Sequence, residues 1–406
     1  MTVEELVTSV GFPSIPLAFM VMLAGALVIG IGAILVWGIM HVIDLSGYAY
    51  IHARVMSMES RLIREEKLKE MMGASTLAGV HAALETTDYS PYLQEMMEAR
   101  AEAIERALNK HMAETYHDIS KMVFNSLGVS DLKKLLDIIL QKWDVYNLKR
   151  ILRGIYAERS IDEIRADLVP VGKLEQDRKT LDLLVGAKSM EEAISGLVGT
   201  PYAALATSLP AFDQTKNLTV LEAKLDKILY ENLWKVWKEV MPKKSGSDNA
   251  GDMFYLNAYL AALIDVLNLK FLFRGKGDKV PSGTLESYLV AGGDLPASLV
   301  KGLIEMETVG SMVSALEGTK YYQPVVGAAQ EYDATGSILP IETALDKYLA
   351  KVTNDLSRMK PFGMGPVIRY LSKKEIEIRN IRAIARGKEV GLSLDDITKL
   401  IVKVGT

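Results

Sequence analysis

The chain has 406 residues, 49% of them apolar and 24% charged, and its 47 Lys and Arg against 51 Asp and Glu leave a formal net charge of −4. A chain of this length can bury several cores without disulfides or metals, and its composition excludes a collagen-like or broadly disordered protein. The weak negative charge argues against a nucleic-acid binder, because phosphate contacts demand a basic surface. Cys is absent and all five His lie within the first 117 residues, which excludes disulfides, thiolate metal sites and Cys nucleophiles.

The first predicted element is a membrane-spanning helix. Residues 17–40 form an unbroken apolar stretch, LAFMVMLAGALVIGIGAILVWGIM, and residues 6–43 contain no Asp, Glu, Lys or Arg. At about 1.5 Å per residue this stretch is long enough to cross the ~30 Å hydrocarbon core of a bilayer. A cleaved signal peptide would need a basic start, whereas residues 1–10 carry Glu4 and Glu5 and no base. A buried core helix is the other alternative, but the stretch shows no polar face.

Basic residues follow this segment and none precedes it. They are Arg54, Arg61, Arg64, Lys67 and Lys69. Because the cytoplasmic flanks of membrane helices are rich in Lys and Arg, we expect the large remainder of the chain on the cytoplasmic side and the N-terminus outside. The sequence therefore predicts a single-pass protein of the cell membrane.

The rest of the chain is predicted to be all-α. Beyond Gly47 the apolar residues recur mostly at spacings of three and four, with few alternating runs. Residues 243–251, KKSGSDNAG, have no such period and are predicted to form a mobile surface loop. One pattern of turn, amphipathic helix and Asn- and Arg-bearing helix occurs three times at intervals of 112 to 121 residues. We expect three similar helical-bundle domains, residues 47–159, 160–280 and 281–406, after an N-terminal anchor of residues 1–46.

The repeated elements align without gaps. The third element reads DVYNLKRILRG at residues 144–154, DVLNLKFLFRG at 265–275 and EIRNIRAIARG at 377–387. The turns read LETTDY at 84–89, LVGTPY at 197–202 and LEGTKY at 316–321, and the amphipathic helices share an apolar-Glu pair that starts at Ile104, Leu221 and Ile341. The positions kept in register are Asp144, Asn147, Arg153 and Gly154, then Asp265, Asn268, Arg274 and Gly275, then Glu377, Asn380, Arg386 and Gly387.

We interpret these positions as structural. Each Arg-Gly pair is typical of a helix C-terminus, where Gly adopts the left-handed conformation and a cation faces the negative end of the helix dipole. An anion site is the alternative, although phosphates prefer helix N-termini. The repeated Asn is unfavourable inside a helix, so we expect it to hydrogen-bond a neighbouring segment across a partly buried contact rather than a ligand. Asp144 and Arg153 point to opposite sides of their helix, which excludes a salt bridge between them.

Helix starts follow two of the three copies. Ser160 with Glu163, and Ser393 with Asp396, have the spacing of a capping box, whereas the second copy has Pro281 at the equivalent place. GAKS at residues 186–189 resembles a phosphate loop but lacks the required earlier Gly. We interpret Ser189 as the cap of a helix that begins at Met190, with Glu192 completing the box.

No catalytic, cofactor-binding or metal site is predicted. His111 and His117 lie six residues apart on a helical stretch, too far around the axis to chelate one ion, so we expect both on a solvated face. The 19 Met and the scattered Tyr follow helical spacing and are expected to fill the core.

The tandem D-x-x-N-L-K-x-x-x-R-G segments, the G-T-x-Y turns and YAYIHARVMSMESRLI at residues 48–63 resemble the C subunit of the archaeal A-type ATP synthase, which is related to the d subunit of V-type ATPases. The similarity covers the chain from about Tyr48 to its C-terminus. This family implies a pseudo-threefold funnel of three helical domains, a non-catalytic rotor socket seated on the membrane ring. For Arg153, Arg274 and Arg386 it implies only a structural role. The apolar segment at residues 17–40 is a departure from what we expect of the family.

The partners that the resemblance implies are the rotor-ring subunits and the central-shaft subunits, with the lipid bilayer contacted through residues 17–40. It implies no nucleic acid, no small-molecule substrate and no cofactor. A membrane-tethered scaffold without a part in rotation and a membrane-bound hydrolase are the alternatives. Triplication favours the rotor part, because a threefold surface can meet a ring of identical subunits, and missing catalytic clusters disfavour the hydrolase. We expect the span inside the ring, since a route outside would meet the stationary ion-channel protein; peripheral attachment is the alternative.

Overall fold

The computed structural model describes residues 17–93, 100–240, 250–356 and 363–402. Within these ranges the chain is helical and contains no strand, so the predicted all-α fold is confirmed. Residues 243–249 of the predicted loop and the acidic N-terminus lie outside the described residues, while Ala250 and Gly251 already belong to a helix. The described helices are α2 (Leu17–Glu59), α3 (Glu65–Gly73), α4 (Leu77–Leu84), α5 (Ser90–Leu93), α6 (Ala101–Asn125), α7 (Ser130–Tyr156), α8 (Ile161–Ala166), α9 (Lys173–Gln176), α10 (Arg178–Val185), α11 (Met190–Ser195), η1 (Ala203–Ser208), α12 (Leu209–Thr215), α13 (Leu218–Val240), α14 (Ala250–Gly277), α15 (Ser282–Tyr288), α16 (Ala297–Glu305), α17 (Val309–Ala315), α18 (Tyr322–Thr335), α19 (Leu339–Asp355), α20 (Gly365–Glu389) and α21 (Leu394–Leu400).

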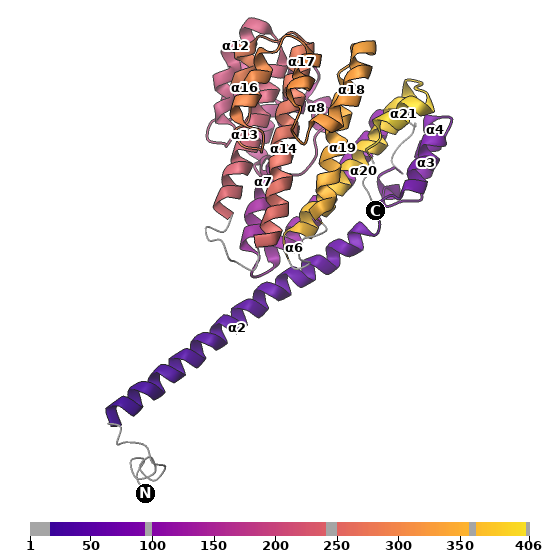
Figure 1. Ribbon diagram of the computed structural model, residues 1–406. Helices are drawn as coiled ribbons and strands as arrows, with labels where there is room; N and C mark the ends of the chain where they lie inside the picture. The colour runs from indigo at the N-terminus through magenta and orange to yellow at the C-terminus, as the bar shows by residue number, and fades with distance from the viewer. Residues whose placement is uncertain (1–16, 94–99, 241–249, 357–362, 403–406) are drawn as a thin grey trace.

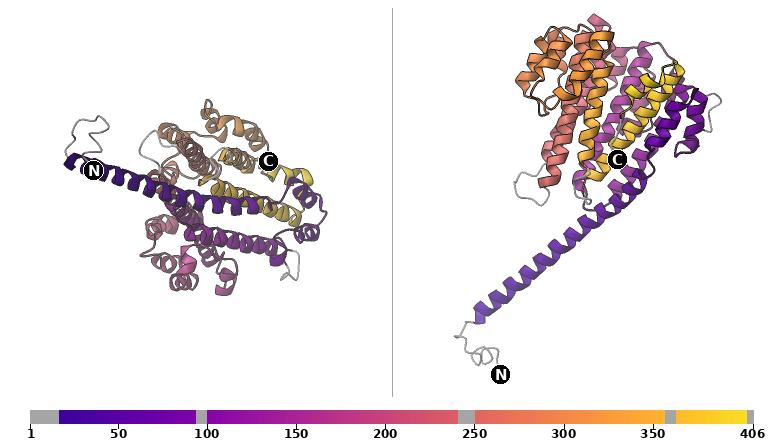
Figure 2. Two further views of the ribbon diagram at one scale, coloured as in Figure 1. Left: turned by 90° about the horizontal axis from the view of Figure 1, so that it is seen from below. Right: turned by 45° about the vertical axis from the view of Figure 1, so that its right-hand side comes forward.

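Helix α2 contains the predicted span and continues past Met40 to Glu59. It begins directly after Pro16, and no proline interrupts it, which allows one continuous helix. Its apolar part is not buried against the rest of the chain, which removes the core-helix alternative. Figures 1 and 2 show this part of α2 projecting away from the body. The other helix apolar enough to cross a membrane, Phe254–Gly277, is mostly buried within the body.

The end of α2 is fixed to the C-terminal part of the chain. Ile51 and Val55 are buried, and the carboxylate of Glu59 pairs with Arg369 at 2.8 Å and Lys373 at 3.0 Å, both on α20. Burial alone would raise the pKa of Glu59, but the two cations outweigh it and lower the pKa. Helix α2 and the last long helix are therefore bonded together.

The long helices α6, α7, α13, α14, α19 and α20 lie lengthwise in one bundle, and shorter helices gather at the end away from the projecting part of α2 (Figure 1). Helix α13 shows why they pack: Leu221, Leu225, Ile228 and Leu229 recur at helical spacing and are all buried. It packs on α7, while α14 packs on α19 and α6 on α20. The last contact brings residues 101–125 against residues 365–389, so the first copy of the repeat packs on the third.

Three clusters of buried apolar side chains form the core. One lies within residues 145–229 and a second within residues 266–345. Each joins the C-terminal half of a long helix to the segment that follows it. The third joins residues 51–143 to residues 364–401 and to parts of α13 and α14. The division into domains 47–159, 160–280 and 281–406 stays a prediction, since the clusters group the residues differently.

Candidate functional site: three repeated joints around a central cavity

The repeated Asn side chains form the same two hydrogen bonds in every copy. Asn147 Nδ2 donates to the carbonyl of Val169 at 2.7 Å, and the amide of Val169 donates to Asn147 Oδ1 at 2.9 Å. The same pairs join Asn268 to Val290 and Asn380 to Val402. All six residues are buried. The expected hydrogen bond to a neighbouring segment is confirmed, and each Asn satisfies both backbone groups of a buried Val.

Each repeated acid accepts hydrogen bonds from a backbone amide and a tyrosine hydroxyl, and Asp265 also accepts from a second amide, that of Asp294. Asp144 accepts from the amide of Leu174 at 2.9 Å and from the hydroxyl of Tyr202 at 3.0 Å. The corresponding partners are Leu295 and Tyr321 for Asp265, and Ile63 and Tyr89 for Glu377. Burial raises the pKa of Asp144 to about 6 in spite of these hydrogen bonds, and it raises the pKa of Asp265 as well.

The tyrosines come from the repeated turns, which share one geometry. Thr200 Oγ1 donates to the carbonyl of Leu197 and accepts from the amide of Tyr202, and the other two turns repeat both bonds. Each turn thus holds its Tyr against the acid of the preceding copy. The order is cyclic, because Tyr89 of the first copy bonds Glu377 of the third.

The repeated arginines follow the same cyclic order. Arg153 donates two bonds to Glu222 at 2.6 and 2.7 Å. Arg274 pairs with Glu342, and Arg386 pairs with Glu105. These acids are the Glu of the apolar-Glu pair in the next copy. A second set of polar contacts repeats beside them, between Lys149 and Asp226, Lys270 and Asp346, and Arg382 and Asn109.

We call these sets of contacts joints. The first joint comprises the Asp144–Tyr202 and Arg153–Glu222 contacts, and the second joint comprises Asp265–Tyr321 and Arg274–Glu342. The closing joint comprises Glu377–Tyr89 and Arg386–Glu105. Sequence reasoning found the acids, arginines and glutamates as repeated positions but did not pair them. The signal was present, because opposite charges are kept in all three copies.

The predicted role of the repeated Gly is wrong. Gly154 lies inside α7, which ends at Tyr156, and Gly154 has no positive φ. A Cβ atom on Gly154 would lie 2.4 Å from the side chain of Ile164, so Gly admits the next helix at close range. Gly275 stands in the same relation to Leu285, and Gly387 to Ile397. The left-handed residues come four positions later, at Glu158, Lys279 and Gly391. The arginines accordingly pair with carboxylates instead of capping a helix end.

The helix starts agree with the sequence in most details. Ser160 and Glu163 form the predicted capping box. Ser393 caps α21 as expected, but its box is absent because the carboxylate of Asp396 accepts from the hydroxyl of Ser393 and not from its backbone amide. Pro281 precedes α15, so the second copy also begins a helix at this place. Ser189 caps α11 as expected, but the box is absent because the carboxylate of Glu192 accepts from the amide of Lys188.

The expectation of a solvated face is wrong for His111 and right for His117. His111 is partly buried against the rings of Tyr89 and Tyr92, at centroid distances of 4.5 and 5.4 Å. Burial, helped by the charge of Lys374, lowers the pKa of His111 to about 3. His117 is exposed. Across the described ranges no group of three His, Asp or Glu side chains is placed to hold a metal ion.

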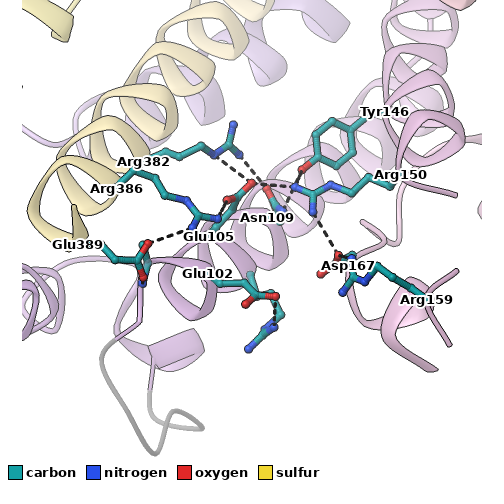
Figure 3. A network of polar contacts seen from close by, with 12 residues as sticks. Glu102, Glu105, Asn109, Tyr146, Arg150, Arg159, Asp167, Arg382, Arg386 and Glu389 are labelled. Carbon is teal, nitrogen blue, oxygen red and sulfur yellow. Dashed lines mark hydrogen bonds and ion pairs between the residues drawn. The ribbon is translucent and has the colours of Figure 1, made fainter. Parts of the chain in front are cut away.

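The closing joint carries charges that the other joints lack. Glu105 is surrounded by Arg150, Arg382 and Arg386 at 2.8, 3.3 and 3.1 Å, and Arg150 also reaches Asp167 (Figure 3). Burial alone would raise the pKa of Glu105, but the three cations lower it. The positions equivalent to Arg150 are occupied by Phe271 and Ala383, so no repeat pattern announced this cluster.

A cavity of about 480 Å³ lies between the long helices, and α6, α7, α13, α14, α19 and α20 all line it. Most of its lining is apolar, as at Leu229, Leu233 and Leu260. Ion pairs line it as well, Lys142–Glu375, Lys149–Asp226 and Arg379–Asp346, and the hydroxyl of Tyr116 donates to Glu375 at 2.8 Å. The helices that the joints hold together thus line this cavity.

These features define an internally triplicated all-α protein in which the third copy closes on the first. A family model described as ATP synthase (C/AC39) subunit matches residues 51–400, and the chain belongs to this family. It is 33% identical over 375 residues to the C subunit of the A-type ATP synthase of Methanocaldococcus jannaschii, covering 91% of this chain and 90% of that relative. It is 32% identical to those of Methanosphaera stadtmanae and Methanothermobacter thermautotrophicus, each over 95% of both chains. The resemblance drawn from the repeats is confirmed.

The family model begins at residue 51, so the apolar segment lies outside the part of the chain that it matches, and its departure from the family stays a prediction. A match that covers 95% of this chain leaves only about 20 residues outside the alignment. Residues 1–40 are twice as many, so both matches must include part of residues 17–40.

Proposed function

We propose that the chain is a non-catalytic central-rotor component of a rotary A-type ATP synthase, a socket that couples the central shaft to the membrane rotor ring during ion-driven ATP synthesis. The cyclic order of the joints carries the proposal, because it closes three helix pairs around one cavity. The names of the relatives support membership in this complex. We include in the proposal the funnel of three domains and the absence of any catalytic site.

The joints suit a part that transmits torque. A socket under torque must resist sliding between its units, and each joint combines a buried Tyr–carboxylate bond with an Arg–Glu pair. Buried hydrogen bonds of this kind are directional and are lost at a full desolvation cost. Because the joints follow a cyclic order, each copy of the repeat is also bonded to both of the other copies.

The membrane location follows from α2. We place residues 17–40 across the bilayer, with the body on the cytoplasmic side and the helix inside the rotor ring. Ile51 is already buried in the body, only 11 residues after Met40. At about 1.5 Å per residue the chain has little slack to reach around the ring. Attachment at the ring's periphery is the alternative.

Co-purification from native membranes tests the socket. The wild-type chain should carry down both ring and shaft subunits. Leu349→Glu places a charge at the cavity lining and should release the shaft while the ring stays bound. Leu183→Glu changes an exposed Leu outside the cavity lining and is the matched control. Recovery of the chain with neither ring nor shaft would favour the tethered scaffold.

Nucleotide binding tests the non-catalytic assignment. We expect calorimetry to show no ATP binding and assays to show no ATP hydrolysis, since GAKS at residues 186–189 ends one helix and caps the next. Micromolar binding that one substitution abolishes would contradict the assignment.

Cross-linking tests the route of α2. Gly25 and Gly32 have open space around them, and the chain has no other Cys to interfere. Gly25→Cys and Gly32→Cys should cross-link to inward-facing ring positions. Cross-links only to the outer ring surface or to the stator would reject the central route.

A further inference from the structure

A cleft of about 600 Å³ lies beside the closing joint, and α6, α7, α8, α10 and α20 all contribute to its walls. Helix α8 belongs to the short helices at the end of the body away from the projecting part of α2 (Figure 1). Among the described residues, the linings of this cleft and of the central cavity share no side chain. The cleft is therefore a separate feature from the cavity of the proposed socket, and one of its walls lies away from the proposed membrane span.

More cations than acids line this cleft. Seven Arg and Lys side chains face four Asp and Glu side chains. Two of these acids, Glu105 and Asp167, are mostly buried and are shared by four arginines (Figure 3), which are Arg150, Arg159, Arg382 and Arg386. Asp182 and Glu389 pair with lining arginines from outside, and cations still outnumber acids when both are counted. The cleft is thus locally positive, although the chain as a whole carries a net charge of −4.

Some of these arginines are not required by the repeated fold. The register of the three copies aligns Arg106 with Ala223 and Thr343, Arg150 with Phe271 and Ala383, and Arg159 with Val280 and Leu392. The other two copies therefore form the same helices without a cation at these positions. Arg150 serves the closing joint through Glu105, but Arg106 and Arg159 pair with Glu102 and Asp167, neither of which belongs to a joint. Arg106 and Arg159 thus indicate a role beyond holding the copies together.

Three arginines at the edge of the cleft are held only by exposed ion pairs. They come from three different helices, and each has a separate carboxylate partner: the pairs are Arg106–Glu102 at 3.2 Å, Arg165–Asp182 at 2.6 Å and Arg178–Glu175 at 2.8 Å. The side chain of Arg178 is 71% exposed. Solvent-exposed pairs contribute little to stability, so a carboxylate from another molecule can replace the chain's own acid at each arginine. Separate arginines of this kind suit several spaced carboxylates better than one compact anion.

We propose that this cleft binds an acidic segment of a partner protein, whose Asp and Glu side chains pair with Arg106, Arg165 and Arg178. The planar guanidinium group binds a carboxylate through two parallel hydrogen bonds, which orients the partner as well as attracting it. Complementary charge also accelerates the encounter and selects against basic or neutral segments. The inference goes beyond the proposed socket, because it assigns the chain a protein contact outside the central cavity.

Fluorescence anisotropy of the full-length chain in detergent tests the cleft, with a labelled oligo-glutamate peptide as the probe. The peptide should bind, and added salt should weaken the binding. Combining Arg106→Gln, Arg165→Gln and Arg178→Gln should raise the Kd by about tenfold. A matched control removes three charges from equally exposed ion pairs outside the cleft and should keep the wild-type Kd; its substitutions are Lys69→Gln, Lys216→Gln and Lys301→Gln.

The alternative results are distinct. Equal weakening in the two triple variants would show attraction to overall charge and would overturn the proposal, as would a peptide that does not bind. Tighter binding of inorganic tripolyphosphate than of the peptide, lost in the cleft variant alone, would assign the cleft to phosphate and reject the acidic segment. If the triple variant does not fold, Arg178→Glu alone changes the most exposed of the three arginines and should weaken peptide binding more than Arg178→Gln does.

Photo-cross-linking extends the test to native membranes. Ala166 is exposed and lines the cleft without carrying a charge, so a photoreactive residue there leaves the arginines intact. Mass spectrometry should identify adducts with segments that are rich in Asp and Glu. Adducts with neutral or basic segments alone would overturn the proposal.

Discussion

The first and second joints are crossed by continuous backbone, and the closing joint is not. In the first joint five residues lead from Val169, held by Asn147, to Leu174, held by Asp144. Gly172 makes this possible with a φ of 108°, because a Cβ atom there would lie 2.1 Å from Asp144 Oδ1. The second joint repeats the arrangement with Gly293.

At the closing joint the two corresponding places are filled from opposite ends of the chain. Asn380 holds Val402, and Glu377 accepts from the amide of Ile63. Where the backbone is interrupted, side-chain charge takes over: Glu105 has three arginine partners, whereas Glu222 and Glu342 are each paired with one. Continuous backbone therefore connects the two sides of the first and second joints, whereas ion pairs between distant parts of the chain connect the two sides of the closing joint.

The largest expected loss of stability distinguishes the closing joint, which depends on ion pairs, from the joints that continuous backbone connects. Glu105→Gln leaves three arginines without their shared anion at a site where its own side chain is 13% exposed. We expect the unfolding free energy to fall by about 3 kcal/mol, as for a broken buried pair. Glu222→Gln removes the ion-pair partner of Arg153 alone, and the side chain of Arg153 is already 59% exposed to solvent. This substitution should lower the unfolding free energy by under ~1 kcal/mol. Chemical denaturation in detergent measures both, and equal losses would mean that the closing joint has no special dependence on charge.

A second effect belongs to the first joint and depends on pH. The folded protein holds the proton of Asp144 up to about pH 6, above its ordinary value of 3.8. The folded state therefore binds more protons in this window, and stability falls as pH rises from about 4 to about 6 and is level above it. Asp144→Asn should remove this decline, which is on the order of 2–3 kcal/mol. Denaturation midpoints of the two proteins across the window give the difference, and parallel curves would contradict the assignment to Asp144.

The smallest expected losses of unfolding free energy are those of the three Asn→Ala variants. Asn147→Ala and Asn268→Ala strand both backbone groups of a buried Val inside a continuous segment, and we expect losses of about 1–3 kcal/mol. Asn380→Ala should cost about the same, because it strands both backbone groups of Val402, which is equally buried. Thermal unfolding ranks the three variants. A variant that keeps its stability while the assembled complex loses coupling would show that its Asn contacts a partner.

The sequence predicted what depends on local pattern. Helical periodicity, the serine caps and the three aligned copies follow from spacing alone, and the unfavourable Asn inside each helix indicated its buried hydrogen bonds. The repeated Gly misled us because Gly after Arg is common at helix ends, whereas here the competing reason is close packing against Ile164, Leu285 and Ile397.

What depends on the closed arrangement could not be read from one copy at a time. The partner of each acid and each Arg belongs to the next copy, so pairing them requires knowing that the third copy returns to the first. His111 was misjudged for the same reason, because Tyr89 and Tyr92 cover a face that its own helix leaves polar. Arg150 escaped notice because it has no counterpart in the other copies.

Helix α2 is bonded to α20, the helix of Glu377 in the closing joint, through Arg369 and Lys373. The interior contacts occur three times, whereas the pairing with α2 occurs once among the described residues. The position of α2 therefore distinguishes one side of the body from all the others. If it revolves, its orientation can be read without ambiguity from the azimuth of α2, and any neighbour that touches α2 meets it once per full turn and not three times.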